Sequence, residues 1–112
     1  LCLADICKDR VFRMAVPIFP SDLNAVHVLN REKQCTIDVA YAINMDGRAE
    51  NIDSRVENTM CQSFRVSGMR AFRSSQFHPG EYLNLCYGRI TFRLENERLT
   101  WEYGDIPGMP NP

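Results

Sequence analysis

Larger apolar residues alternate with small or polar residues from Cys35 to Ile43, and this period of two is the clearest pattern in the chain. Such alternation is typical of a β-strand with one buried face. Asp46 and Gly47 follow, and an Asp-Gly pair supplies the positive φ angles of a tight hairpin turn. We therefore expect a central strand, a hairpin, and a more polar second strand over residues 48–56 that lies at an edge of the sheet.

A helical period and a second alternation follow this hairpin. Small or apolar residues recur at helical spacing as far as Ser74, and they are Cys61, Phe64, Gly68 and Phe72. Alternation returns over residues 85–95 and predicts a third strand. A hairpin, a crossing helix and a returning strand favour an arrangement in which the third strand pairs antiparallel with the first. We therefore expect a three-stranded antiparallel sheet in the order second, first, third (2-1-3), with a helix packed on one face.

The ends of the chain are less regular. Residues 1–18 form an N-terminal arm, and a Ser-Asp pair before residue 23 predicts a short N-terminal helix that stops near Asn30. Residues 99–103 could form a fourth strand, whereas two glycines and three prolines predict a flexible tail over residues 104–112. The fold class that we expect is α+β, with all 112 residues in a single domain.

The charge balance bears on the kind of partner. The chain has 13 basic and 14 acidic residues and a net charge of −1, so it lacks the basic excess of a dedicated nucleic-acid binder. No apolar run reaches the roughly 20 residues that a membrane-spanning helix needs. These totals favour a globular domain that does not bind nucleic acid.

Five cysteines are many for a chain of this length, and they are Cys2, Cys7, Cys35, Cys61 and Cys86. No C-x-x-C pair occurs among them, and the histidines sit in unrelated surroundings. Disulfides formed in an oxidising, extracytoplasmic compartment therefore explain the cysteines better than a zinc site does. Buried free thiols are the alternative, and an odd count leaves at least one cysteine without a partner in this chain.

The expected topology predicts one disulfide. Cys35 opens the first strand on its apolar face and Cys61 begins the apolar face of the helix, so both lie at the same end of the sheet. A Cys35–Cys61 disulfide would close a loop of about 27 residues and stabilise the fold by about 3 kcal/mol. Cys86 lies at the opposite end. It pairs with Cys2 or Cys7 if the N-terminal arm reaches it, and otherwise it is a buried free thiol.

Signatures of catalysis are missing from the sequence. It contains no nucleophile elbow, phosphate-binding loop, metal-binding motif or distinctive carboxylate pair. His27 and His78 could act as acid and base in a small hydrolase, but the Phe-His-Pro context of His78 is better explained as a turn. We therefore expect a binding protein without a cofactor rather than an enzyme.

Five short segments follow one another in a recognisable order. They are Phe19-Pro20, the strand Ile37–Ile43, the hairpin Asp46-Gly47-Arg48, the helix end at Phe72-Arg73, and the turn Phe77-His78-Pro79. Their order and spacing resemble the C-terminal domain of TonB, the energy transducer of Gram-negative outer-membrane transport, over roughly residues 16–95. The sequence departs from that family at two places. Phe72 stands where the family usually has Trp, and Gln34-Cys35-Thr36 stands where it usually has a Gly-x-Val entry.

The resemblance implies a periplasmic domain that captures an extended peptide of an outer-membrane transporter by strand addition. A free strand edge offers unpaired backbone N–H and C=O groups to such a peptide. The resemblance also implies a tether, preceding Leu1, to an inner-membrane complex that uses the proton-motive force. The free edge of the third strand and its border would then bind the partner. The residues expected to do so are Phe19, Pro20, Arg89, Thr91 and Arg93.

Each of these assignments has an alternative. Phe19 can be a core aromatic, and the arginines can form a solvated sheet face. If residues 99–103 pair with the third strand, binding requires their displacement or moves to the fourth strand. A second function class is a secreted or periplasmic, disulfide-stabilised interaction, inhibitor or self-assembly module, in which the same edge joins another copy into a homodimer.

Overall fold

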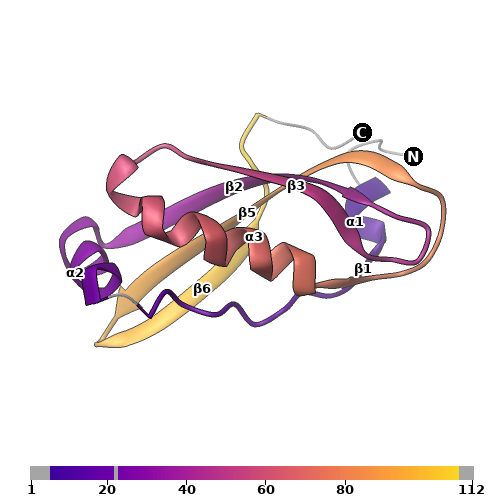
Figure 1. The fold of residues 1–112 in the computed structure, drawn as a ribbon. Coiled ribbons are helices and arrows are strands. Elements are labelled where there is room, and N and C mark those ends of the chain that lie inside the picture. The colour runs from indigo at the N-terminus through magenta and orange to yellow at the C-terminus, as the bar shows by residue number, and fades with distance from the viewer. Residues whose placement is uncertain (1–5, 22, 109–112) are drawn as a thin grey trace.

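The computed structural model describes residues 6–21 and 23–108, which form an α+β fold (Figure 1). Its helices are α1 (Ile6–Asp9), α2 (Leu23–Glu32), the 3₁₀ helix η2 (Thr59–Phe64) and α3 (Arg65–Ser74). Its strands are β1 (Val11–Arg13), β2 (Gln34–Ile43), β3 (Ala49–Val56), β4 (Gln76–Phe77), β5 (Leu83–Glu95) and β6 (Arg98–Gly104). Together they form a two-stranded sheet, β1-β4, and a four-stranded sheet in the order β3-β2-β5-β6, and every pairing is antiparallel.

The prediction of a three-stranded sheet in the order 2-1-3 is therefore wrong, because β6 adds a fourth strand. β6 pairs with residues Arg89 to Glu95 of β5. The turn between the two strands holds Asn96 and Glu97, whose φ angles of 51° and 63° suit a two-residue hairpin between twisted strands. Neither turn residue is glycine, so the sequence signal for this hairpin is weak.

The helix α3 covers one face of the four-stranded sheet and lies across β2 and β3 (Figure 1). The side chains of Ile37, Phe64 and Phe92 are completely buried in the core between the sheet and the helical layer. Gly68 lets α3 approach β2 closely, because a Cβ at this position would lie 2.8 Å from Cγ2 of Ile37. We call this the helix side of the sheet and its opposite the back face.

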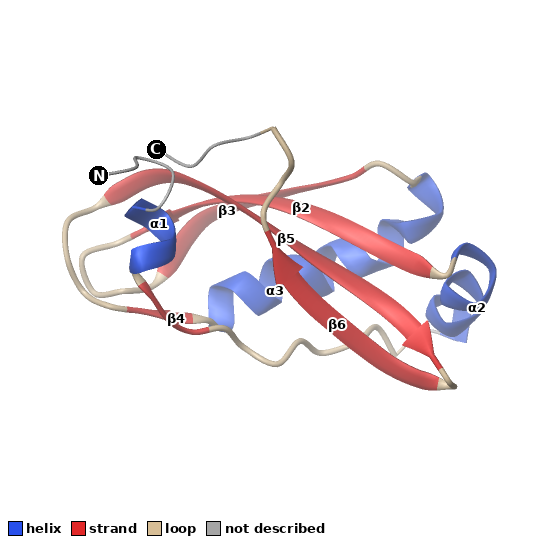
Figure 2. Cartoon of the chain, turned by 180° about the vertical axis from the view of Figure 1, so that it is seen from behind, coloured by secondary structure: helices blue, strands red, loops and turns tan. Residues whose placement is uncertain are grey.

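The segment that follows β6 crosses the back face of the sheet (Figure 2). Ile106 belongs to the predicted flexible tail, but its side chain is buried, and it lines a depression on the back face together with Ala40 and Tyr87. The prediction of a flexible tail is therefore wrong at Ile106, because this apolar side chain packs on the sheet. Residues 109–112 lie outside the described residues.

The N-terminal arm contains more structure than the sequence predicts. β1 pairs with β4, and Cys7 of α1 forms a disulfide with Cys86 of β5. Of the alternatives open for Cys86, the structure therefore selects Cys7, whereas Cys2 lies outside the described residues. The guanidinium of Arg10 holds the arm against two loops, because it donates to the backbone carbonyls of His78 (2.7 Å), Glu81 (2.6 Å) and Asn44 (3.3 Å).

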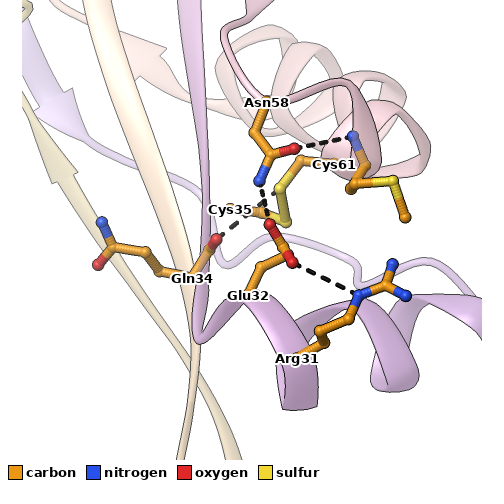
Figure 3. Close-up of polar contacts among 7 residues, drawn as sticks. Arg31, Glu32, Gln34, Cys35, Asn58 and Cys61 are labelled. Atoms are coloured by element: carbon orange, nitrogen blue, oxygen red, sulfur yellow. Dashed lines mark hydrogen bonds and ion pairs between the residues drawn. A yellow bond between two sulfur atoms is a disulfide. The ribbon is translucent and has the colours of Figure 1, made fainter.

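The predicted Cys35–Cys61 disulfide is present and joins β2 to η2. Figure 3 shows its surroundings, where Asn58 lies between η2 and the end of α2. The side-chain oxygen of Asn58 accepts from the backbone N–H of Met60 (3.0 Å) and caps η2, while its Nδ2 donates to Glu32 (2.6 Å). Two disulfides in one small domain indicate an oxidising, extracytoplasmic environment.

The short N-terminal helix is longer than predicted, because α2 continues past Asn30 to Glu32. Lys33 then adopts a φ of 74° and donates its N–H to the carbonyl of Leu29 (2.9 Å). A residue with positive φ at this position is a common helix ending. Arg31 and Glu32 therefore belong to the last turn of the helix, and Lys33 ends it.

Candidate functional site

The strand β5 does not offer the free edge that the sequence predicts. Residues 83–93 of β5 pair with β2 on one side, and residues 89–95 pair with β6 on the other. Arg89, Thr91 and Arg93 therefore lie on a strand with a neighbour on both sides. Their assignment to a free edge is wrong, because β6 satisfies the backbone groups that an incoming strand would need.

Arg89 is committed to an ion pair on the back face. Its Nε donates to Oδ1 of Asp38 (2.7 Å) and its Nη2 donates to Oδ2 (3.3 Å). Asp38 is buried, and Nη2 of Arg55 lies 3.6 Å from the same carboxylate. The hydrogen bond to Asp38 raises the pKa of Arg89 above its usual value. This ion pair joins β2 to β5 across their shared register.

Thr91 and Arg93 also have partners within the sheet. Thr91 is buried, and its hydroxyl shares a hydrogen bond with the hydroxyl of Thr36 (3.2 Å). Arg93 donates from Nε to the side chain of Gln34 (3.3 Å), and its Nη1 lies 3.5 Å from the carboxylate of Glu102. These contacts extend the polar pairing of Arg89 along the back face.

Phe19 and Pro20 lie at the end of the extended part of the arm, and both are half-buried. The ring of Phe19 makes edge contacts with Phe92 (5.2 Å between centroids) and with Trp101 (6.3 Å). Phe19 therefore belongs to the border of the core and lies beside β6 at the same time. The alternatives of core aromatic and border of a binding edge are both compatible with this position.

The extended arm from Met14 to Pro20 runs along the helix side of the sheet next to β6 (Figures 1 and 2). Ala15 fastens it, because its N–H donates to the hydroxyl of Ser75 (2.9 Å) and its carbonyl accepts from the hydroxyl of Tyr103 (2.7 Å). The side chains of Val16 and Ile18 are each 71% exposed. The arm thus presents apolar groups to solvent beside β6.

The outer edge of β6 has no paired strand among the described residues. Its register with β5 has no irregularity, and Trp101 lies opposite Phe92 on the helix side. The side chains of Leu99 and Trp101 are each 38% exposed although they lie on this apolar side. Val16 and Ile18 belong to the segment of the arm whose residues Ala15 and Phe19 contact Tyr103 and Trp101 of β6. A regular free edge with an exposed apolar side suits the addition of another strand.

The other outer edge, on β3, is irregular. Residues 51–52 lie opposite the single residue Tyr41, so β3 contains a bulge, and Asn51 has a φ of 52°. The side chain of Asn51 donates to the hydroxyl of Tyr82 (3.3 Å). Arg65 of α3 donates to the hydroxyl of Ser54 (2.9 Å). A bulged edge with polar side chains engaged locally suits strand addition poorly.

A cavity of about 320 Å³ lies where β6 ends, and its walls include Val11, Phe72 and Gly88. Tyr41 and Tyr103 also line it. Burial raises the pKa of Tyr41 to about 12, and the charge of Asp105 acts in the same direction. Burial likewise raises the pKa of Tyr103 to about 12. Both tyrosines are therefore neutral at physiological pH.

The histidines that a hydrolase would need do not meet. His27 lies on α2, whereas His78 follows β4, and Figure 2 shows these two elements at opposite ends of the molecule. The ring of His78 contacts Phe12 (5.2 Å between centroids). Within residues 6–21 and 23–108, no cluster of three or more His, Cys, Asp and Glu side chains could hold a metal ion. In the same part of the chain, no helix is long and apolar enough to cross a membrane.

No family model matches the chain, and no curated protein matches it. The case for a function therefore rests on the geometry of this chain and on the resemblance of its sequence pattern. The sequence predicted the binding edge on β5, or on the fourth strand if residues 99–103 pair with β5, and it did not single out Val16, Ile18, Leu99 or Trp101 as binding residues. The alternation of apolar and polar residues over 99–103 is a signal that could have pointed to these side chains, but a strand of this kind can lie anywhere in a sheet.

Proposed function

We propose that this domain is a periplasmic peptide-binding module that captures an extended segment of an outer-membrane transporter by strand addition to β6. The resemblance of residues 16–95 to the C-terminal domain of TonB supports the class of partner. The two disulfides agree with an extracytoplasmic location. The domain would then transmit a pull from an inner-membrane complex to the bound peptide.

The observation that carries this proposal is the contrast between the edge of β5, which β6 occupies, and the outer edge of β6, which no strand of the described part of the chain occupies. A peptide added to β6 forms backbone hydrogen bonds with the strand, which gives affinity that depends little on its sequence. Alternate side chains of the peptide pack on Leu99 and Trp101, beside Val16 and Ile18 of the arm. Phe19 supports the ring of Trp101, which gives the predicted Phe19 and Pro20 an indirect role.

The experiment is a titration of the isotope-labelled domain with a short synthetic peptide from the N-terminal region of an outer-membrane transporter, followed by amide chemical shifts. We expect the largest shifts in Arg98–Gly104 and the fluorescence of Trp101, the single tryptophan, to move to shorter wavelength as it becomes covered. If the peptide shifts β3 amides instead, or none, the proposal is wrong.

Matched variants separate the two outer strands. Trp101→Lys places a charge on the apolar side of β6 and should abolish peptide binding, while Ile52→Lys places the same charge on β3 and should leave binding unchanged. Trp101 is 38% exposed and Ile52 is partly buried against the core, so thermal unfolding must show that both variants fold. Equal loss of binding in both variants would contradict a site on β6.

A further inference from the structure

The strand β6 carries a symmetric pattern of charges. On the back face the strand presents Arg98, Thr100 and Glu102, and on the helix side it presents Leu99 and Trp101. The charged residues stand two positions on either side of Thr100, one basic and one acidic. Arg98 is exposed, and the side chain of Glu102 is 70% exposed.

Geometry limits how two copies of β6 can pair. In an antiparallel pair, residues opposite each other point to the same face of the sheet, so the twofold axis must pass between two equivalent residues. Registers centred on Leu99, Thr100 or Trp101 place the middle of β6 at the axis. Of these three, the register centred on Thr100 sets Arg98 opposite Glu102 of the second copy, and it does so twice by symmetry.

The other two registers lack this match. Centring on Trp101 sets Glu102 opposite Thr100 and Arg98 opposite Gly104, whereas centring on Leu99 sets Arg98 opposite Thr100. The register centred on Thr100 also sets Leu99 opposite Trp101 on the helix side. In that position the leucine of the other copy covers each indole, which is 38% exposed in the single chain.

We propose that β6 pairs antiparallel with β6 of a second copy of this chain, with Thr100 at the twofold axis, and that the two four-stranded sheets become one continuous sheet. The charge pattern favours a second copy as the partner, because each β6 strand supplies both the basic residue Arg98 and the acidic residue Glu102 that the opposite strand needs. Glu102 also approaches Arg93 of its own chain (3.5 Å), so the intermolecular pair extends an existing row of charges.

This self-association uses the same edge as the proposed capture of a peptide, but it does not depend on that function. The two occupants exclude each other, so a dimer would hold the edge until a peptide displaces the second copy. Exposed ion pairs contribute little individually, whereas like charges placed directly opposite each other weaken strand pairing. The charges therefore set the register and the choice of partner more than the strength of the complex.

The experiment measures mass by sedimentation equilibrium from low to high micromolar concentration. We expect the native chain to form a dimer as concentration rises, with a shift of the Trp101 fluorescence to shorter wavelength. Arg98→Glu and Glu102→Arg each set like charges opposite each other twice, and each should weaken the dimer by about tenfold or more. Arg70→Glu reverses an exposed charge on α3 and should leave the dimer unchanged.

Two combinations of the charge reversals make the test specific to the register. An equimolar mixture of the Arg98→Glu and Glu102→Arg variants restores opposite charges at both contacts, and should form a heterodimer that neither variant forms alone. The double variant with both changes should again form a homodimer. Circular dichroism and thermal unfolding verify that each variant is folded. A native chain that stays monomeric, or a mixture that fails to associate, would overturn the proposal.

The outcome is separable from that of the proposed function. If the dimer is missing and a transporter peptide still shifts the amides of Arg98–Gly104, the self-association is wrong and the peptide capture stands. If the mixture of the two variants and the double variant both restore the dimer, and no peptide displaces it, the self-association stands and the peptide capture is wrong. Dimers that survive both single reversals would place the contact elsewhere and overturn the β6 register.

Discussion

The two outer strands of the four-stranded sheet, β3 and β6, have edges of opposite character. β3 is bulged opposite Tyr41, and its polar side chains are engaged by Tyr82 and Arg65. β6 keeps a regular register with β5, and apolar side chains on its helix side are exposed. Bulges and polar side chains are features by which proteins prevent unwanted strand addition. Only the β3 edge has these protective features, so we assign partner binding to the β6 edge.

The β3 side of the sheet is also held more firmly than the β6 side. The disulfides fasten β2 to η2 and β5 to α1, and the Arg10 guanidinium fastens the arm to the loops beside them. β6 is held by its pairing with β5 and by the contacts of Tyr103 and Trp101 with the arm. β3 pairs with β2 and packs against α3, so we expect substitutions on the β3 side to change stability more than substitutions on the β6 side.

Gly47→Ala should give the largest loss of stability, on the β3 side. Gly47 lies in the turn that enters β3 with a φ of 84°, and a Cβ there would clash with the carbonyl oxygen of Phe77. We expect the free energy of unfolding, measured in urea, to fall by about 3 kcal/mol or more. Gly108→Ala is the control, because Gly108 has a φ of 76° and a Cβ added there would meet no atom within 4 Å. Equal losses in the two variants would show that the close approach at Gly47 is not limiting.

Removing the Cys35–Cys61 disulfide should give the next largest effect. Replacing both cysteines by alanine frees η2 from β2, and we expect the free energy of unfolding to fall by about 3 kcal/mol. The amide shifts of Arg98–Gly104 should not change in the folded variant, because β6 is held by its pairing with β5 and not by η2. Altered shifts along β6 would mean that its open edge depends on this disulfide.

The free energy of unfolding at alkaline pH depends on two tyrosines, Tyr41 in β2 and Tyr103 in β6. Burial raises the pKa of each to about 12 from an ordinary value of about 10. Their stabilising contribution is therefore complete below pH 10 and is lost as the pH rises through 12. We expect a loss of about 2 to 3 kcal/mol for Tyr41 over this range, and a smaller loss for the half-buried Tyr103. Tyr41→Phe should flatten the curve of unfolding free energy against pH more than Tyr103→Phe does, and the reverse order would contradict the greater burial of Tyr41.

Glu97→Gly should give the smallest effect, confined to the β6 side. Glu97 has a φ of 63° in the turn before β6, a conformation that glycine adopts without steric cost. We expect the free energy of unfolding to rise by about 0.5 kcal/mol, after the greater flexibility of glycine in the unfolded chain is subtracted. Asn96→Gly should gain less, because asparagine tolerates this conformation better. A loss of stability in Glu97→Gly would mean that the glutamate side chain has a contact of its own.

Some features of the fold could be predicted because their signals are local. The alternation over Cys35–Ile43 predicts a strand with one buried face, and the strand β2 occupies Gln34–Ile43. The Asp-Gly pair predicts a turn, and Gly47 has the expected positive φ. The Cys35–Cys61 disulfide followed from placing both residues at one end of the sheet. In each case a few neighbouring residues carry the information.

Other features could not be predicted because they depend on distant partners. α1 and β1 have four and three residues, too few to show a period, and they are held by contacts of Cys7 and Arg10 with residues far along the chain. The assignment of Arg89 to a free edge failed for a similar reason. Whether β5 has an open edge depends on the segment after Asn96 and Glu97, which forms a hairpin without a glycine signal.

The sequence by itself determined which residues alternate between the two sides of each long strand, where the Asp-Gly turn lies, and that β6 carries opposite charges on either side of Thr100. These properties follow from the order of side chains along one strand or turn. The tertiary structure alone decided that β6 closes the edge of β5 and that, within residues 6–21 and 23–108, no strand pairs with the outer edge of β6. It did so because strand pairing is a competition for backbone hydrogen bonds among segments far apart in the chain, and the hairpin partner that is already attached occupies the edge first.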